Sequence, residues 1–156
     1  ESRSANIDSI AWANLVFAGL LYAAFKSSSQ SKSLTELTLF AALIIGCFQA
    51  LAVFPGASRS GMAITGALII GLNIKDTSRF AFLLSIPTIM GALILMLAKG
   101  AFSIALSDIL IMLTGFIGSA LIAFFTIKSF LQFVERIGMT PFVIYRVALG
   151  LVLLLI

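Results

Sequence analysis

Residues 54–62 read FPGASRSGM and separate two of the most apolar stretches of the chain, residues 37–54 and 62–72. As a helix, residues 62–72 would reach about 16 Å, roughly half of a hydrocarbon core of about 30 Å. A half-length helix after a Pro-Gly turn predicts a re-entrant hairpin, in which the chain descends, breaks at Pro55 and Gly56 and climbs back. Irregular backbone at membrane depth is tolerated only where protein buries it or where it lines a watery cavity. The hairpin therefore predicts a cavity.

The composition is that of a membrane protein. Of 156 residues, 61% are hydrophobic and only 10% are charged, which is far from the balance of a soluble domain. The chain has no histidine, so imidazole catalysis and histidine-bound zinc are excluded. Cys47 is its one cysteine, which excludes an internal disulfide and a cysteine-cluster metal site. The ten Lys and Arg residues are scattered, so we expect no nucleic-acid partner.

Four further apolar stretches complete the pattern, and short polar links separate them. The stretches are residues 10–25, 80–98, 109–127 and 141–156, and the links are residues 26–33, 73–79, 99–108 and 128–138. A helix needs roughly 17 to 20 apolar residues to cross a bilayer, which most of these stretches reach or approach. We therefore expect an all-α membrane protein with about five transmembrane helices and the re-entrant helix-loop-helix hairpin. Residues 1–156 would form a single polytopic membrane domain.

Positive charges assign the two sides of this arrangement. Both limbs of a hairpin return the chain to the side that it left, so the links can be placed on one side or the other. One side then carries Lys26, Lys32, Lys75, Arg79, Lys128 and Arg136, and the other side carries Arg3 and Lys99. The richer side is expected in the cytoplasm. Two full spans in place of the hairpin would give the same count, so this alternative stays open.

The loop that interrupts the apolar stretches has the composition of an anion site. Arg59 cannot be neutralised at accessible pH, and its guanidinium fork fits two oxygens of a phosphate. Ser58 and Ser60 add hydroxyl groups, and Gly56 and Gly61 let backbone N–H groups approach a ligand closely. A helix that starts near residue 62 would direct its positive end at the loop. The alternative is a simple turn whose arginine reaches a lipid headgroup or a carboxylate.

Two further polar residues lie in apolar stretches. Arg146 follows Pro141 by five positions, and it either lines the cavity or extends to the lipid headgroups beside Tyr145. Gln49 precedes the loop, and it hydrogen-bonds either the loop or another helix. The carboxylates all lie in polar links or at segment edges. None of them can be placed near Arg59 from the sequence.

Three stretches together resemble one known family. They are IIGCFQALAVFPGASRSGMAITGALIIGL at residues 44–72, FAFLLSIPTIMGA at residues 80–92 and YRVALGL at residues 145–151. Pro-Gly-x-Ser-Arg-Ser-Gly, preceded by a Gln and followed by the F-x-F-x-L-x-I-P run and a Tyr-Arg, resembles the second signature of the undecaprenyl-diphosphate phosphatases of the bacitracin-resistance type. The resemblance covers the chain well from residue 37 onward, and the first helix more loosely.

The resemblance implies a function and roles for individual residues. These multi-pass enzymes of the bacterial cytoplasmic membrane hydrolyse undecaprenyl diphosphate to undecaprenyl phosphate and inorganic phosphate, for the synthesis of peptidoglycan and other envelope glycans. A divalent metal, Mg²⁺ or Ca²⁺, is implied as the cofactor. Arg59 would grip the diphosphate and Ser58 and Ser60 would bind or position it. Gln49 and Arg146 would line the cavity, and Thr65 would partly replace the usual Thr, which is Ala63 here.

The chain departs from the family pattern in one decisive way. The first signature, a Glu-x-x-x-Glu pair with a Ser and a His in a partner hairpin, is absent, so the metal ligands implied by the resemblance are not in this chain. We therefore expect the isolated chain to have little or no activity. The alternatives are a protein that binds or translocates the lipid diphosphate, or a degenerate remnant. The partners left open are membrane lipids, a second copy of the chain and a complementing N-terminal half.

Overall fold

The computed structural model describes residues 2–99 and 106–155 of the chain. Within them the regular structure is helical: α1 (Ser2–Ser27), η1 (Leu34–Glu36), α2 (Leu39–Ala50), η2 (Leu51–Val53), α3 (Arg59–Ile70), α4 (Ile74–Ala98), α5 (Leu106–Ile137) and α6 (Thr140–Leu154). The predicted all-α class is confirmed. Most of the expected link at residues 99–108 lies outside the described residues.

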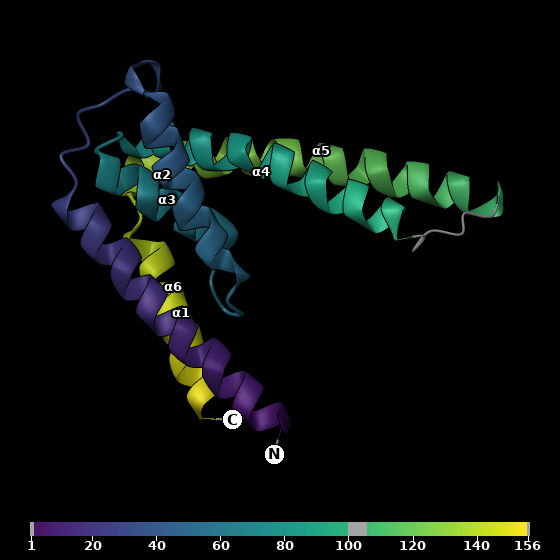
Figure 1. The fold of residues 1–156 in the computed structure, drawn as a ribbon, viewed down its shortest axis with the longest axis horizontal. Coiled ribbons are helices and arrows are strands. Elements are labelled where there is room, and N and C mark those ends of the chain that lie inside the picture. The colour runs from purple at the N-terminus through teal and green to yellow at the C-terminus, as the bar shows by residue number, and fades with distance from the viewer. Residues whose placement is uncertain (1, 100–105, 156) are drawn as a thin grey trace.

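Three pairs of helices make up the molecule (Figure 1). The first helix α1 lies beside the last helix α6, and the short helices α2 and α3 form a hairpin next to them. The long helices α4 and α5 run side by side away from the rest of the chain, and α3 contacts α1, α2 and α4. Helix α3 therefore connects the three pairs.

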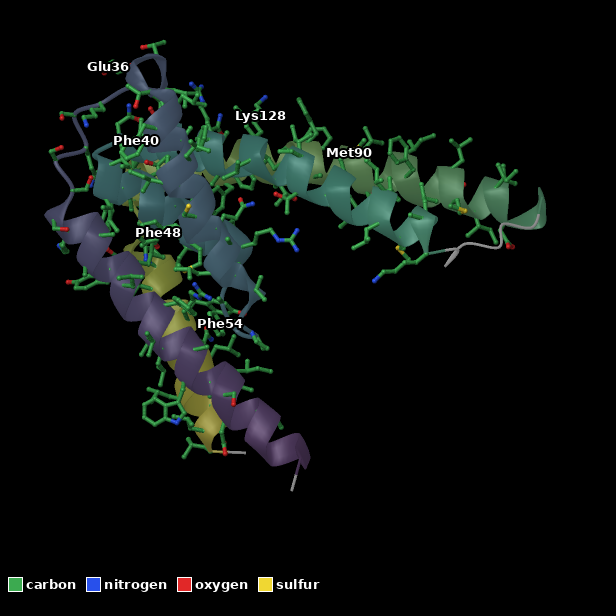
Figure 2. The ribbon with its side chains drawn as sticks, in the orientation of Figure 1. Glu36, Phe40, Phe48, Phe54, Met90 and Lys128 are labelled. Carbon is green, nitrogen blue, oxygen red and sulfur yellow. The ribbon has the colours of Figure 1, made fainter. Side chains whose placement is uncertain are left out.

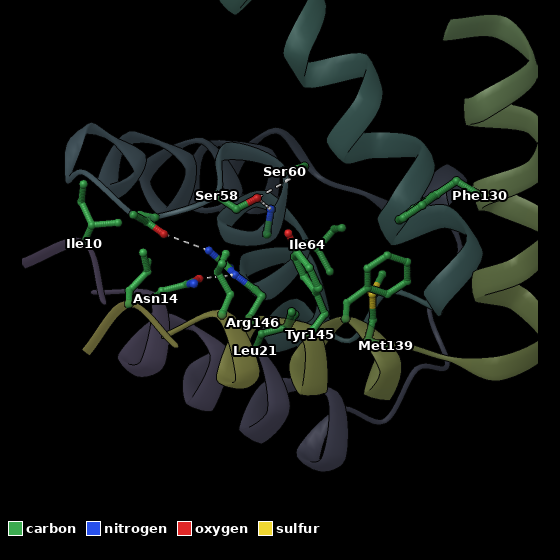
Figure 3. Close-up of a pocket in the computed structure, with 16 residues that line it drawn as sticks. Ile10, Asn14, Leu21, Ser58, Ser60, Ile64, Phe130, Met139, Tyr145 and Arg146 are labelled. Atoms are coloured by element: carbon green, nitrogen blue, oxygen red, sulfur yellow. Dashed lines mark hydrogen bonds between the residues drawn. The ribbon is translucent and has the colours of Figure 1, made fainter. Parts of the chain in front are cut away.

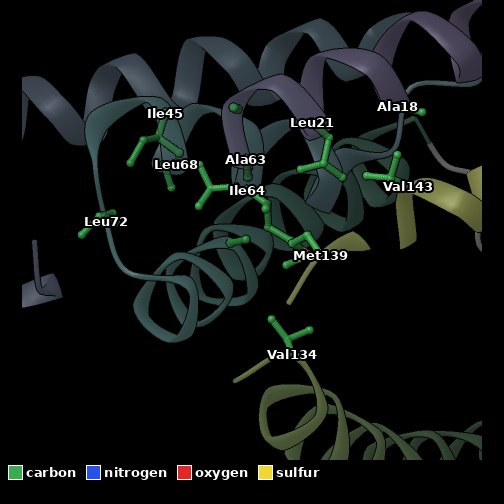
Figure 4. Packing of buried hydrophobic residues seen from close by; sticks show 13 residues of the cluster. Ala18, Leu21, Ile45, Ala63, Ile64, Leu68, Leu72, Val134, Met139 and Val143 are labelled. Carbon is green, nitrogen blue, oxygen red and sulfur yellow. The ribbon is translucent and has the colours of Figure 1, made fainter. Parts of the chain in front are cut away.

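Helix α3 is buried around its whole circumference, which is the pattern of a core helix. Every residue from 61 to 68 is buried. Small residues allow this close packing, because a Cβ on Gly66 would lie 2.9 Å from the Cβ of Phe48 on α2. Figure 4 shows the core around α3, to which α1, α2, α5 and α6 contribute residues. The motif that begins α3 is thus carried on a helix whose following residues are buried.

Local signals explain where the short helices begin and end. Ser58 caps α3 by accepting a hydrogen bond from the backbone N–H of Gly61 at 3.1 Å. Gly71 ends α3 in the left-handed conformation, with φ of +93°. Asn73 caps α4 in the same way as Ser58 caps α3, accepting from the N–H of Asp76 at 2.9 Å.

Several boundaries differ from the sequence prediction, and the expected link at residues 73–79 is already helical from Ile74 onward. Helix α3 starts at Arg59 instead of near residue 62, because Ser58 is already the cap. The expected link at residues 128–138 is instead helical as far as Ile137. Its charged residues are good helix formers, its apolar Phe130 and Val134 face the core, and the first residue to break the helix is Gly138, with φ of +78°.

Within residues 2–99 and 106–155, three helical segments are long and apolar enough to cross a membrane: Ile7–Ser27, Ile74–Ala98 and Asp108–Ile137. The stretches Leu39–Val53, Arg59–Ile70 and Thr140–Leu154 are apolar but shorter. Apolar side chains cover α4 and α5, and most of them are exposed, as Met90 on α4 illustrates in Figure 2. A surface of this kind is typical of helices that contact lipid or other membrane helices.

The polar ends of several helices meet at one end of the molecule. Lys32, in the segment between α1 and η1, pairs with Leu72 through a backbone bridge, and its carbonyl oxygen accepts from the N–H of Asn73 at 2.9 Å. The Nζ of Lys75 at the start of α4 lies 2.8 Å from Glu135 Oε1 near the end of α5. Residues assigned to the more positive side by the charge count are therefore neighbours in space.

Candidate anion and lipid site

The loop before α3 rests directly on α1. Gly56 has φ of +91°, and a Cβ at this position would lie 2.5 Å from the backbone oxygen of Ile10. Only glycine satisfies both requirements without strain. After this turn Ser58 begins α3, and its Oγ lies 3.2 Å from Ser60 Oγ. The two hydroxyl groups are thus held at the N-terminus of α3, where the helix dipole favours negative charge.

Arg146 reaches this loop from α6 (Figure 3). Its Nε–H donates to Asn14 Oδ1 on α1 at 2.9 Å, and its Nη2–H donates to the backbone oxygen of Gly56 at 3.0 Å. Its Nη1 lies 2.9 Å from the position of a Cβ on Gly61, so the absence of a side chain at Gly61 leaves room for the guanidinium. One cation is therefore fixed beside the N-terminus of α3.

A cavity of about 450 Å³ opens beside Arg146. Its polar lining comes from Asn14, Ser58, Ser60, Tyr145 and Arg146, together with the backbone of Gly56, Ala57 and Gly61. Its apolar lining comes from Ile10, Leu21, Ile64, Phe130, Met139, Phe142, Leu149 and Leu153. A cavity with one cationic group and a largely apolar wall suits an amphipathic ligand with an anionic head.

Arg59 lines a different cavity. This second cavity, of about 380 Å³, is formed by Gly46, Gln49, Ala50, Ala52, Val53, Arg59 and Thr88. Within it, Gln49 Nε2 donates to Thr88 Oγ1 on α4 at 2.7 Å. Gln49 Oε1 is buried and has no hydrogen-bond partner among the described residues. The two arginines of the predicted site thus belong to separate cavities on either side of one loop.

The structure brings together only some of the predicted site residues. Gly56, Ser58, Ser60 and Gly61 share the first cavity with Arg146, whereas Arg59 and Gln49 share the second. Gln49 was predicted to hydrogen-bond either the loop or another helix, and in the structure it donates to Thr88 on α4. Thr65 lines neither cavity: it is 1% exposed, and its hydroxyl donates to the backbone oxygen of Gly61 at 2.7 Å.

Asn14 is the functional candidate that sequence reasoning missed. It is 4% exposed, and it lies in the first cavity with Arg146. The available signal was an amide side chain within the apolar stretch 10–25, because a polar group in such a helix needs a partner. Its partner lies 132 positions away, so the sequence alone did not identify it.

A comparison with protein families matches residues 1–152 to the family described as bacitracin resistance protein BacA. The chain belongs to the BacA family. Curated relatives share 38% to 45% identity with it over most of its length. A protein named undecaprenyl-diphosphatase from Alcanivorax borkumensis is 45% identical over 154 residues, which are 99% of this chain and 57% of the relative.

Two more curated relatives show a similar identity and coverage. Proteins named undecaprenyl-diphosphatase from Teredinibacter turnerae and Saccharophagus degradans are 44% and 42% identical. They match 98% and 96% of this chain, but only 58% and 56% of their own lengths are covered. The chain therefore spans somewhat more than half the length of the curated relatives that it matches.

The first cavity does not suit the divalent metal that the family resemblance implies. Among the residues the structure describes, no three His, Cys, Asp or Glu side chains form a group that could hold a metal ion. The residues that line the cavity include no carboxylate, and its oxygens from Asn14 and Gly56 already accept hydrogen bonds from Arg146. Mg²⁺ and Ca²⁺ prefer carboxylate oxygens, so the lining of this cavity does not fit either ion.

Proposed function

We propose that this BacA-family chain supplies the substrate-gripping part of an undecaprenyl-diphosphatase. The enzyme hydrolyses undecaprenyl diphosphate to undecaprenyl phosphate and inorganic phosphate. The single observation that carries this proposal is Arg146, held at the polar end of a cavity whose other walls are apolar. The diphosphate would lie against Arg146 and the start of α3, and the prenyl tail would lie along the apolar wall.

The chemical roles follow from the groups present. The free face of the Arg146 guanidinium would bind phosphate oxygens, and Ser58 and Ser60 would donate hydrogen bonds to them. Fixed donors of this kind stabilise the negative charge that develops when a phosphoryl group is transferred. Arg59 would act from the other side of the same loop, within the second cavity, once the rest of the catalytic groups are present. These groups, and any Mg²⁺ or Ca²⁺, would be held outside the first cavity.

The proposed membrane arrangement follows from helix length. Helices α2 and α3 have 12 residues each, so each reaches about 18 Å and falls short of the hydrocarbon core of about 30 Å. They would form a re-entrant hairpin in the bacterial cytoplasmic membrane, with the loop at mid-depth. The end of the molecule that gathers Lys32 and Lys75 would face the cytoplasm. α1, α4 and α5 would span the bilayer, and α6 would reach across with its flanking residues.

The test separates binding from turnover. The chain is reconstituted in lipid nanodiscs, and the binding of farnesyl diphosphate and the release of phosphate from it are measured. We expect binding without turnover by this chain, and turnover when it is co-reconstituted with a complementing N-terminal half. A second copy is the other candidate partner, and turnover by the chain alone as a homodimer would favour it. Binding without turnover in every combination would favour a lipid-binding or translocating protein.

A matched pair of variants assigns the binding to the cavity. Arg146→Met removes the guanidinium from the cavity, whereas Arg136→Met removes one from the exposed end of α5. We expect the first variant to weaken binding by about a hundredfold, since a bidentate charged contact is lost, and the second to bind as the wild type does. Equal affinities for the two variants would refute the proposal.

A further inference from the structure

Both hydrogen-bond acceptors that hold Arg146 are uncharged. One is the side-chain amide oxygen of Asn14, at 2.9 Å from Nε, and the other is the backbone oxygen of Gly56, at 3.0 Å from Nη2. Buried arginines are commonly paired with carboxylates, which satisfy the N–H groups and cancel the charge. Here two of the five N–H groups donate to neutral acceptors, and the positive charge is not cancelled.

No other charge in the cavity lining offsets this one. Among the described residues that line the first cavity, Arg146 is the only one that is ionised at neutral pH. Asn14 is 4% exposed and comes from a different helix, so its amide is fixed in position relative to α6. A carboxylate at the same position would form an ion pair with Arg146 and compete with an anionic ligand for the guanidinium.

We infer that Asn14 is a positioning residue that fixes the Arg146 guanidinium without neutralising it, and so gives the cavity its preference for a diphosphate over a monophosphate. This inference rests on the proposed function, because it takes the lipid diphosphate as the ligand. A cation attracts a ligand more strongly as the ligand's negative charge increases. Retaining the full charge of Arg146 therefore favours the substrate of the hydrolysis over its product.

Substitutions at position 14 separate charge from structure. Asn14→Asp keeps an acceptor of the same shape and adds a negative charge, whereas Asn14→Ser keeps a neutral acceptor. Asn14→Leu removes the acceptor altogether. Gln132→Glu, on the exposed surface of α5 and outside the cavity lining, makes the same change of charge and serves as the control.

The readout is the affinity of each variant in nanodiscs for farnesyl diphosphate and for farnesyl monophosphate, with Tm followed by the fluorescence of Trp12. Asn14→Asp is expected to bind the diphosphate at least about tenfold more weakly, to bind the monophosphate with a smaller loss, and to keep its Tm. Asn14→Ser should keep the wild-type ratio of the two affinities. Asn14→Leu should lower Tm and reduce the affinities for both ligands by the same factor, which is the result expected when a structural role is lost.

Four results would overturn the inference or its basis. If Asn14→Asp reduces the affinities for both ligands equally, or reduces neither, the amide does not act through charge. If Asn14→Ser changes the ratio as Asn14→Asp does, neutrality is not what matters. If Arg146→Met also binds the diphosphate normally, the proposed function itself fails, and this inference fails with it. A loss of binding in Arg146→Met together with a wild-type ratio in Asn14→Asp refutes the role of Asn14 alone.

Discussion

Arg146 and Gly56 lie 90 positions apart in the chain, and the Nη2–H of Arg146 donates to the backbone oxygen of Gly56 at 3.0 Å. This bond joins α6 to the loop that precedes α3. The same loop rests on α1 at Ile10, and α1 also provides Asn14. Three segments that are distant in sequence therefore fix one guanidinium, and changes in any of them should be felt at the cavity.

Adding a methyl group at Gly61 should displace the guanidinium without unfolding α3. The new Cβ would lie 2.9 Å from Arg146 Nη1, and the flexible end of that side chain can move away. Alanine is also a better helix former than glycine, by about 1 kcal/mol. We expect Gly61→Ala to keep or raise Tm while it weakens the binding of farnesyl diphosphate by about tenfold. Gly115→Ala is the control, because its Cβ would meet nothing within 4 Å.

Adding a methyl group at Gly56 should instead destabilise the fold. Its Cβ would lie 2.5 Å from the backbone oxygen of Ile10, and φ is +91°. Backbone cannot move as a side-chain terminus can, and the left-handed conformation alone costs about 1–2 kcal/mol for a residue with a Cβ. Gly56→Ala should therefore lower Tm in a Trp12 fluorescence melt, whereas Gly46→Ala, with no atom within 4 Å of its Cβ, should not. A Gly56→Ala protein as stable as the wild type would contradict the close contact.

The hydrogen bond between Gln49 and Thr88 should show a strong coupling in a double-mutant cycle. Thr88→Val removes the acceptor of the Gln49 amide at 2.7 Å and leaves a second unpaired polar group beside the buried Oε1. Such an unpaired group costs about 1–3 kcal/mol, whereas removing both partners is close to neutral. We expect Gln49→Leu combined with Thr88→Val to restore most of the stability lost in Thr88→Val alone. If the double variant loses as much stability as the two single variants together, the coupling is excluded.

Substitution of Arg59 should affect turnover, whereas substitution of Arg146 should affect ligand binding. Arg59 lines the second cavity and not the first, so Arg59→Gln should leave the binding of farnesyl diphosphate by this chain within about threefold of the wild type. In a complemented, active enzyme the same change should reduce turnover by orders of magnitude, since the proposed function gives Arg59 a role in the catalytic step that is separate from binding by this chain. A large loss of binding in this chain would mean that the ligand reaches both cavities.

The sequence predicted the elements and the composition of the site better than its geometry. The all-α fold, the break at Pro55 and Gly56, and the gathering of Gly56, Ser58, Ser60 and Gly61 followed from local signals, because caps and turns are fixed by neighbouring residues. Between the alternatives left open for Arg146, the structure shows it in the cavity lining.

The separation of Arg59 from Arg146 could not be predicted, since it depends on which face of α3 each side chain reaches. The pairing of Arg146 with Asn14 joins helices 132 positions apart, and no local pattern carries that information. The helical continuation of α5 to Ile137 does not follow from the apolar pattern, because charged residues interrupt that pattern although they are good helix formers.

The pairing of α1 with α6 has a consequence for how the protein is made. Helix α6, which is synthesised after α1, packs against it, and Gly150 of α6 approaches α1 so closely that a Cβ there would lie 2.8 Å from Leu15. Until α6 has been synthesised and inserted, α1 lacks its neighbour and Asn14 lacks the cation that it holds. Contacts of such high sequence separation form late and slowly. The cavity around Arg146 therefore forms only after α6 has been inserted, and a nascent chain released before that step would leave a polar amide exposed to lipid.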